Sequence, residues 1–457
     1  MNKLIVKDRT FVFQGNEIPL TDLYTTDVYV YSDEQAPRFV NDLFCVNESF
    51  SSLTQVYLAI EFFITKNSIA EVDFTKADHI LKLYIYDIAR KHGIIRHGMI
   101  GITKAVTGFV SWWYMLASTL YLAWLMAKIP HSKDPINVAE KFAVLRQKSA
   151  IQKFKAFNEI EKEYEDPFSK TSVYRFYPRL RRVGWVLKSF FKARLSIARM
   201  HKFYRPLLGA ASVFAFDNHY RKRIVHGHLY KYLMTAYLPN FVGCTYYTGS
   251  NLDRYSVIEW EIAGNLGIKT VCLPHGLEYG YRFPKGFSAD VFYANSEFAA
   301  RHLNSLYGTD KYVYDESITS RMFKLSNAEP HEKMVVFFTE PQEYYVNQNV
   351  LSELEPKLRN KGIKLFVKLH PGDTEAHYAG CNYSYISDYT KSLSYNICVS
   401  RKSTVLLEAI YNNSTAIAII TTKKDKSVFD TFPSLQSEKI IKTYSVKDLF
   451  DEILKHY

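Results

Sequence analysis

Two short apolar runs in the second half of the chain stop abruptly at polar residues, and this pattern constrains the fold strongly. The first run, residues 365–369, ends at His370-Pro-Gly, and the second, residues 397–399, ends at Ser400-Arg-Lys-Ser-Thr. Short runs of this kind, apolar except for Lys368 in the first, and with such polar ends, are typical of buried β-strands. Ligands of parallel α/β sheets bind at the carboxyl ends of the strands. We therefore expect a binding site where these two runs end.

The second run leads directly into a predicted helix at residues 405–411. Ser403 and Thr404 precede it, and both residue types are preferred at helix starts. The first N–H groups of a helix are free, and its dipole is positive at that end. This combination favours an anion, most simply a phosphate.

From residue 205 onward, predicted strands and helices alternate. Strands are expected at 212–217, 241–247, 268–273, 291–294, 334–338 and 416–420, besides the two runs above, with a closing helix at 446–456. Such alternation predicts parallel sheets with right-handed crossovers. Residues 53–90 fit two amphipathic helices. We expect an α/β fold with two Rossmann-like domains, residues 1–300 and 301–457, and a helical, basic insertion at about 100–205.

Polar side chains at the strand ends form one candidate site if the carboxyl edges of the two sheets oppose each other. They are His275, Glu278, His370, Ser400, Ser403, Thr404 and Glu408, with Lys368 on the same strand face as His370. A lysine and a histidine suit a departing nucleotide phosphate, because one neutralises charge and the other donates a hydrogen bond or a proton. Glu408 suits ribose hydroxyls. Each motif also has a structural interpretation, since His-Pro is a common turn and Ser-x-x-Ser-Thr a common helix start.

The composition restricts the classes of partner but does not select one of them. The net charge of +12 suggests an anionic partner: a nucleotide sugar, a membrane surface or nucleic acid. The five cysteines are dispersed and form no C-x-x-C pair, as expected of buried thiols in a reducing compartment. The first residues lack the apolar stretch of a signal peptide. We expect a cytoplasmic protein.

Residues 105–127 contain no charged side chain and are long enough to cross a bilayer as a helix. Their hydroxyl residues, tyrosines and central tryptophans favour an interface or a protein interior over the hydrocarbon centre. A buried core helix, a helix lying in the membrane surface and a true span all remain open.

Residues 175–205 carry ten basic residues and no acidic one, interleaved with apolar residues. This pattern predicts a basic amphipathic helix that docks on an anionic membrane surface. The alternative is the solvated face of a packed helix. No recognised nucleic-acid module accompanies the run, so nucleic acid is not the expected partner.

Several common enzyme motifs are missing from the contexts that they require. The sequence has no Walker lysine loop, G-x-G-x-x-G, H-E-x-x-H or G-x-S-x-G in such a context. Its aspartates do not form the Asp-x-Asp metal site of many nucleotide-sugar enzymes. We therefore expect chemistry without a metal or another cofactor.

Three short segments occur in a fixed order: Ile268–Gly276 with its Pro-His-Gly end, Lys368-Leu-His-Pro371 and Ser400-Arg-Lys-Ser-Thr404. This set resembles bacterial surface-polysaccharide glycosyltransferases of the GT-B fold, especially capsule polysialyltransferases and related transferases of CMP-activated sugars. It is more loosely similar to teichoic-acid glycerophosphotransferases. The resemblance extends over residues 212–420.

The resemblance implies two Rossmann-like domains facing across a cleft, with His370 at the nucleotide phosphate. It also implies that Ser403 and Thr404 bind phosphate or the donor carboxylate. Polysialyltransferases take their general base from an acidic Asp/Glu-Asp/Glu-Gly motif, of which this sequence has no clean copy. The base remains open: His275, in the His-Gly position of the phosphotransferases, is the first candidate, and Asp217 and Glu278 follow.

We therefore expect a glycosyltransferase of capsule or surface polysaccharide, peripheral on the inner face of the cytoplasmic membrane. Its donor is expected to be a CMP-activated acidic sugar such as sialic acid or Kdo, and its acceptor a glycan or a lipid-linked glycan. Residues 175–205 would hold it at the anionic membrane surface. A CDP-polyol phosphotransferase of the teichoic-acid type and a non-catalytic glycan- or membrane-binding protein are the alternatives.

Overall fold

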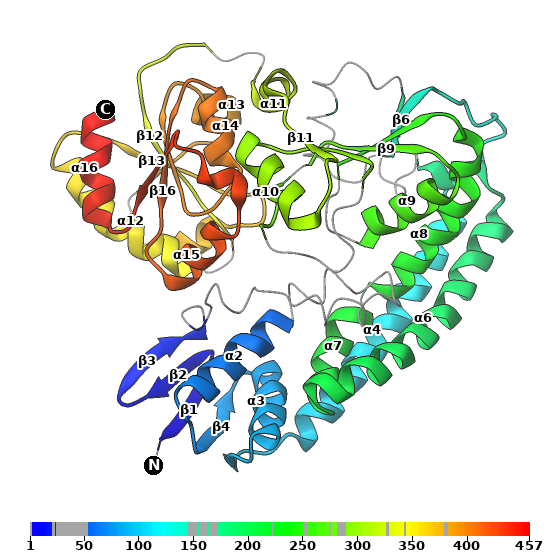
Figure 1. Cartoon of the computed structure of the whole chain (residues 1–457), viewed down its shortest axis with the longest axis horizontal. Helices are drawn as coiled ribbons and strands as arrows, with labels where there is room; N and C mark the ends of the chain where they lie inside the picture. The colour runs from blue at the N-terminus through cyan, green and yellow to red at the C-terminus, as the bar shows by residue number, and fades with distance from the viewer. Residues whose placement is uncertain are drawn as a thin grey trace. The chain divides into compact units, whose positions relative to one another are not determined.

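The computed structural model of the chain divides into two compact units. It describes residues 2–20, 23, 54–144, 154, 162–164, 172–221, 223–249, 254–274, 276–280, 289–325, 329–341, 344–378 and 383–457. Unit 1 contains residues 1–151, 158–275 and 281–292, and unit 2 contains residues 152–157, 276–280 and 293–457. The division falls within β10, whereas the sequence placed the domain boundary after residue 300. The protein is an α/β protein with two parallel-sheet Rossmann-like domains (Figure 1).

Unit 1 begins with a five-stranded sheet of order β3-β2-β1-β4-β5. Its strands are β1 (Lys3–Asp8), β2 (Thr10–Phe13), β3 (Asn16–Pro19), β4 (Glu71–Ala77) and β5 (Ile95–His97). The first three form an antiparallel meander, and β1, β4 and β5 are parallel. Helices α2 (Gln55–Lys66) and α3 (His79–Lys91) flank β4 in the chain. The two predicted helices are thus confirmed, but the sequence interpretation missed β4 between them.

A second, Rossmann-like sheet follows, with the order β11-β10-β9-β8-β6-β7, and all of its strands except β11 lie wholly or mostly in unit 1. Its strands are β6 (Lys141–Val144), β7 (Lys162–Tyr164), β8 (Thr245–Thr248), β9 (Lys269–Cys272), β10 (Val291–Tyr293) and β11 (Tyr312–Val313). Every pairing from β10 to β7 is parallel. The strands predicted at 268–273 and 291–294 are confirmed with shorter bounds, and the strand predicted at 241–247 is confirmed with its bounds shifted to Thr245–Thr248. Strands β6 and β7 lie in the segment that we expected to be helical.

In the part of the chain that the structure describes, the helices that accompany this sheet are α4 (Gly101–Lys128), α6 (Arg179–Leu208), α7 (Ser212–Arg221), α8 (Ile224–Tyr237) and α9 (Arg254–Asn265). The strand predicted at 212–217 is wrong, because these residues form α7. A six-residue apolar run does not by itself distinguish a strand from a buried helix. The helix forms because Asp87 of α3 accepts hydrogen bonds from the N–H groups of Ala211 and Ser212, at 2.7 and 2.6 Å, and so caps its first turn.

Unit 2 is built on a six-stranded sheet of order β14-β13-β12-β15-β16-β17, in which every pairing is parallel. The strands are β12 (Val335–Phe338), β13 (Leu365–Lys368), β14 (Ser384–Tyr385), β15 (Ile397–Ser400), β16 (Thr415–Ile419) and β17 (Ile440–Thr443). In chain order this is 3-2-1-4-5-6, the doubly wound Rossmann arrangement. The strands predicted at 334–338, 365–369, 397–399 and 416–420 are confirmed.

Helices cover both faces of this sheet. The described helices of unit 2 are α10 (Glu297–Tyr307), α11 (Glu316–Phe323), α12 (Tyr344–Arg359), α13 (Tyr389–Leu393), α14 (Val405–Tyr411), α15 (Lys423–Asp430) and α16 (Val446–His456). One core packs α12 and α16 against one face, and a second core packs α11, α14 and α15 against the other. Because both faces are covered, the central strands read as continuous apolar runs.

Candidate functional site at the carboxyl edge of the unit 2 sheet

The switch point of the unit 2 sheet lies at β12, because the chain moves to β13 on one side of this strand and later to β15 on the other. Crossover connections leave such a point in opposite directions, which opens a space above the strand ends. Three loops meet there: residues 339–341 after β12, 369–373 after β13 and 401–404 after β15. The His-Pro-Gly and Ser-Arg-Lys-Ser-Thr segments are therefore next to the same strand.

Side chains of the β12 loop hold the other two loops in place. Thr339 Oγ1 accepts a hydrogen bond from the N–H of His370 at 3.0 Å. Glu340 Oε1 accepts one from the N–H of Lys402 at 2.7 Å. Both backbone groups lie beyond the end of the sheet ladder, so these side chains supply partners that neighbouring strands no longer offer.

A buried ion cluster anchors the β15 loop to α15. The guanidinium of Arg401 donates to both carboxylate oxygens of Asp425, at 2.8 and 2.6 Å, and both side chains are fully buried. Lys402 Nζ also donates to Asp425, at 2.7 Å, and Asn347 accepts from Arg401 at 3.3 Å. Burial alone would raise the pKa of Asp425, but the hydrogen bonds and charges of Arg401 and Lys402 hold it below its usual value.

His370 has a defined tautomer. Its Nδ1 accepts a hydrogen bond from the N–H of Gly372 at 3.0 Å. A backbone N–H is always the donor, so Nδ1 carries no proton, and the neutral ring carries its hydrogen on Nε2. His370 is exposed and can offer this Nε2–H to an anion. Lys368 donates to the carbonyl oxygen of Ser387, a neutral partner that leaves its positive charge uncompensated by that bond.

A second histidine, in the short 3-10 helix Glu375–Tyr378 that follows this loop, has the opposite tautomer. His377 Nδ1 lies 2.6 Å from Asp373 Oδ1, and the Asp373 side chain is fully buried. Tyr378 donates to the other Asp373 oxygen at 2.7 Å, and the ring of Tyr344 stacks on His377 at 4.0 Å between centroids. Burial would raise the pKa of Asp373, but hydrogen bonds from His377, Tyr378 and Thr339 outweigh it and lower the pKa.

Because Asp373 is ionised, Nδ1 of His377 donates to it. Nε2 of the neutral ring is then an acceptor on a side chain that is 34% exposed. His370 and His377 thus present a donor and an acceptor at one strand end. The sequence analysis missed Asp373 and His377, although a carboxylate and an imidazole four residues apart, directly after His-Pro-Gly, are a readable signal.

The predicted donor-binding residues of the β15 segment differ in accessibility. Ser400 is buried within β15, where its hydroxyl donates to the Phe338 carbonyl at 3.4 Å. Ser403 and Thr404 are half-buried at the start of α14, and Ser403 Oγ accepts from the N–H of Val405 at 3.3 Å. Glu408 accepts a hydrogen bond from the Tyr389 hydroxyl. Their predicted contacts with a donor remain predictions.

Of the three candidates for the general base, the structure describes Glu278 and Asp217. His275 lies outside the described residues. Glu278 is fully buried, and its oxygens accept from Ser434 at 2.5 Å and from the N–H of Asn295 at 2.6 Å. Burial raises the pKa of Glu278. This geometry favours an anchor for the segment 276–280 over an exposed proton acceptor.

Asp217 belongs to unit 1, and the strand end on which its candidacy rested does not exist. It lies on α7, is buried, and contacts His201 Nε2 at 2.6 Å and Arg221 at 3.3 Å. A helix residue with two such partners is typical of structural ion pairs. A catalytic role for Asp217 therefore has no support from its position.

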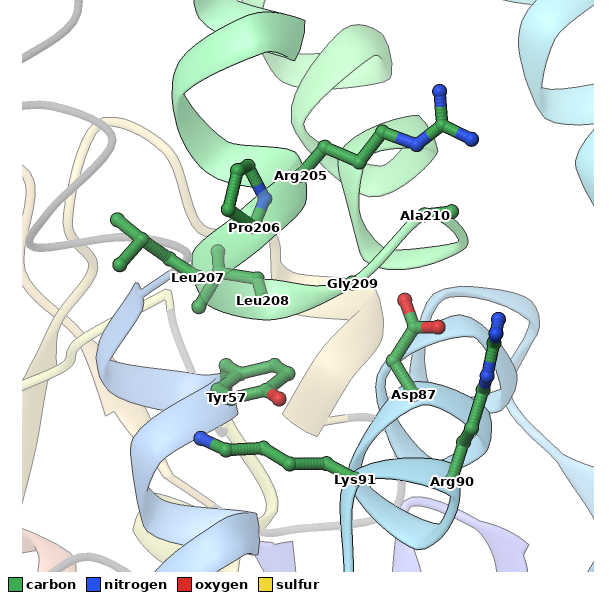
Figure 2. A pocket seen from close by; sticks show the side chains of 10 residues that line it. All are labelled: Tyr57, Asp87, Arg90, Lys91, Arg205, Pro206, Leu207, Leu208, Gly209 and Ala210. Carbon is green, nitrogen blue, oxygen red and sulfur yellow. The ribbon is translucent and has the colours of Figure 1, made fainter.

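Unit 1 has a separate pocket of about 400 Å³ between α2, α3 and the end of α6 (Figure 2). Tyr57, Asp87, Arg90 and Lys91 line it together with residues 205–210. Gly209 has a φ of +102°, and a Cβ at this position would lie 2.2 Å from Asp87 Cγ. Since Asp87 caps α7, the polar centre of this pocket serves to shape the turn between α6 and α7.

Comparisons with known proteins identify no family. No protein-family model and no curated protein matches the sequence. Among solved structures, the chain is similar to Methanocaldococcus jannaschii UDP-GlcNAc 2-epimerase in complex with UDP-GlcNAc and UDP. The TM-score is 0.35 and the sequence identity 11%, with 70% of this chain and 92% of the epimerase chain covered. The fold assignment rests on the two parallel sheets of the chain itself.

Proposed function

We propose that this protein is a nucleotide-sugar-dependent glycosyltransferase of surface-glycan biosynthesis that binds its donor nucleotide at the carboxyl edge of the unit 2 sheet. The observation that carries the proposal is the His370 loop, which places an exposed Nε2–H donor next to the switch point of a 3-2-1-4-5-6 sheet. Nucleotides bind at such switch points. The GT-B arrangement, the CMP-activated acidic donor and the metal-independent chemistry belong to the same proposal.

In the proposed reaction, a hydroxyl oxygen of the acceptor bonds to the anomeric carbon of the donor. The bond from that carbon to the nucleotide phosphate breaks, and its electron pair leaves on the phosphate oxygen. His370 Nε2–H and the Lys368 ammonium stabilise this developing charge, because both groups are held by backbone partners before the phosphate arrives. Ser403 and Thr404 add hydroxyl donors to the same phosphate.

The acceptor proton needs a base, and two histidines are candidates. His275 remains a prediction from the resemblance. His377 has support from the structure, because the ionised Asp373 holds its Nδ1–H and leaves Nε2 free to accept a proton. Asp373 would also stabilise the imidazolium that forms.

Nucleotide binding tests the proposal directly. We would titrate the full chain with CMP, CDP, UDP and GDP by calorimetry, and repeat the titration with His370→Ala. His456→Ala is the matched control, since His456 is also surface-accessible. Its ring lies 3.8 Å from Glu452 at the surface, and its backbone carbonyl, which the substitution keeps, accepts from Lys333. We expect CMP to bind, with an affinity at least about tenfold lower in His370→Ala, as for loss of one charge-assisted hydrogen bond, and unchanged in His456→Ala.

Turnover then separates the enzyme from a binding protein. With CMP-activated sialic acid or Kdo as donor, we expect CMP release that His370→Ala and His377→Ala abolish and His456→Ala retains. A preference for CDP would favour the polyol phosphotransferase, and UDP or GDP would replace the proposed donor. Absence of binding to all four nucleotides would overturn the proposal in favour of a non-catalytic protein.

A further inference from the structure

Helix α4 differs from a core helix in which side it buries: small hydroxyl residues lie on its buried side, and large apolar residues lie on its exposed side. Its buried stripe contains Thr107, Ser111, Met115 and Thr119, followed by Leu122 and Met126. The hydroxyls of Ser111 and Thr119 donate to the carbonyls four residues earlier, at 2.6 and 2.8 Å, so they need no partner from outside the helix. Small hydroxyl residues on a packed stripe are typical of helices in membranes.

The outward face of α4 is apolar and aromatic. Ile102, Phe109 and Leu120 are 78%, 65% and 64% exposed. Val106, Val110, Trp112, Trp113, Tyr114, Tyr121 and Trp124 are exposed as well. Only 28% of the most apolar window of the helix is buried inside the protein. A contiguous apolar surface of this kind marks an interaction site. Of the three alternatives for residues 105–127, the buried core helix is therefore wrong.

Both ends of α4 are attached to unit 1. At its start, Lys104 Nζ lies 5.2 Å above the ring of Phe214 on α7. Just beyond its end, Arg182 of α6 donates to the carbonyl of Ile129 at 2.6 Å. Helices α6 and α7 both pack along α4 (Figure 1). A helix held at both ends by charged helices lies along the surface of the unit, and it cannot cross a bilayer unless α6 and α7 enter with it.

Helix α6 adds cations beside α4. Its exposed apolar residues Leu187, Phe191 and Leu195 recur at four-residue spacing and form a stripe. Lys188 and Lys192 are exposed next to this stripe, and Arg194, Arg199 and Lys202 are exposed further along the helix. Anionic headgroups attract such cations, whereas a second copy of this positively charged surface repels them.

We propose that the α4 face docks flat on the surface of an anionic lipid bilayer, with the cations of α6 on the headgroups. Tryptophan and tyrosine rings suit the boundary between headgroups and acyl chains, and three of the five tryptophans of the chain lie on α4. The sequence analysis predicted a membrane contact through residues 175–205. In the structure, we assign the cationic part of this contact to α6 and its apolar part to α4. It is independent of the proposed enzymatic function.

Vesicle flotation with the full chain tests the proposal. We expect binding to vesicles that contain phosphatidylglycerol, and an affinity at least about tenfold lower when Phe109, Trp113 and Leu120 are all replaced by Asp. The matched control replaces Tyr444, Leu454 and Tyr457 by Asp, three exposed residues of unit 2. This control has the same net charge and should bind like the wild type.

The contribution of the α6 cations can be measured separately, from vesicle affinity and its dependence on salt. Lys188→Gln and Lys192→Gln should each lower the affinity for anionic vesicles by about fivefold, and added salt should reduce this difference. In the wild type, brominated lipids should quench tryptophan fluorescence, which needs no variant.

Three results would overturn the proposal. The first is equal vesicle binding by the α4 triple variant and its control. The second is retention of the chain in membranes after an alkaline carbonate wash, which would indicate a spanning helix. The third is a dimer in sedimentation velocity that the triple variant dissociates, together with no vesicle binding, which would make a second copy the occupant of this face.

Discussion

His370 and His377 show how single backbone and carboxylate contacts define the chemistry of a side chain. The N–H of Gly372 donates to Nδ1 of His370, which therefore carries no proton, and Asp373 accepts from the protonated Nδ1 of His377. The two rings therefore expose different groups, although they lie seven residues apart in the chain. Which nitrogen reacts is decided by the partner of the other nitrogen.

Glu278 leads to a prediction of pH dependence. Burial raises its pKa, so the folded chain binds this proton more tightly than the unfolded chain does. The resulting stabilisation is complete below the unfolded pKa of about 4.3 and is lost as the pH rises through the folded pKa. Glu278→Gln keeps an acceptor for the Asn295 N–H, and its amide N–H₂ can donate to the Ser434 hydroxyl in place of accepting from it. We expect its unfolding temperature, relative to wild type, to increase from pH 4 to pH 7.

Calorimetric scans across this range give the measurement. Glu353→Gln is the control, because Glu353 is an exposed residue of α12 that pairs with Lys357 at the surface. Identical pH profiles for wild type and Glu278→Gln would contradict the assigned burial of this carboxylate.

Gly209 leads to a second prediction at the residue scale. Its φ of +102° is strained for any other residue, and an alanine Cβ would displace the carboxylate of Asp87 from the start of α7 (Figure 2). We expect Gly209→Ala to lower the free energy of unfolding by at least about 2 kcal/mol. Gly93→Ala is the matched control: Gly93 has a φ of +66° but no atom within 4 Å of its Cβ position, so about 1 kcal/mol is expected. Equal losses in urea unfolding would contradict the role of the Asp87 contact.

At the scale of elements, the Arg401–Asp425 pair joins the β15 loop to α15 across a fully buried contact. Such a pair stabilises little overall, because removing both charges from water costs about as much as their attraction returns. Its effect is geometric, since it allows one position for the loop that carries Ser403 and Thr404.

Separate and joint removal of the two charges tests this view. Asp425→Ala leaves a buried guanidinium and should cost about 3–5 kcal/mol of unfolding free energy. The double variant Arg401→Met with Asp425→Leu should recover most of this loss while nucleotide binding stays impaired. Removal of the exposed Lys357–Glu353 pair should cost at most about 1 kcal/mol. Full nucleotide affinity in the double variant would contradict the positioning role.

At the scale of the whole molecule, the two units are not consecutive stretches of chain. Residues 276–280 belong to unit 2, although residues before and after them belong to unit 1. Among the described residues, five hydrogen bonds join this segment to the rest of unit 2. Two go to Glu278, one runs from the Asn295 side chain to the Gly276 carbonyl at 3.1 Å, one from Gly280 N–H to the Thr431 carbonyl at 2.5 Å, and one from the His302 ring to the Gly280 carbonyl at 2.7 Å.

Fragments of the chain test this assignment. We expect fragment 276–457 to be more stable than fragment 293–457 by about 2.5–7.5 kcal/mol, as five hydrogen bonds of about 0.5–1.5 kcal/mol each predict. The ring of Tyr279, 5.0 Å from that of Phe432, adds to this difference. Thermal unfolding followed by circular dichroism compares the two fragments, and equal midpoints would show that residues 276–280 do not stabilise unit 2.

The local sequence was sufficient for much of unit 2. Strands β12, β13, β15 and β16 and helix α14 lie where the apolar runs and their polar ends predicted them, because a strand covered on both faces is recognisable from a few consecutive residues. The convergence of the His370 and Ser403 loops also followed from the expected parallel order.

Only the tertiary structure decided the rest. The strand predicted at 212–217 became α7 because Asp87, more than a hundred residues earlier, caps its first turn. Arg401 is a charged residue type that is usually exposed, and it is buried here because it pairs with Asp425 of α15. The apolar residues of α4 face outward because its hydroxyl stripe packs on α6 and α7. The physical reason is range: apolar periodicity and turn residues act within a few positions, whereas burial, caps and ion pairs depend on residues that the fold brings together from afar.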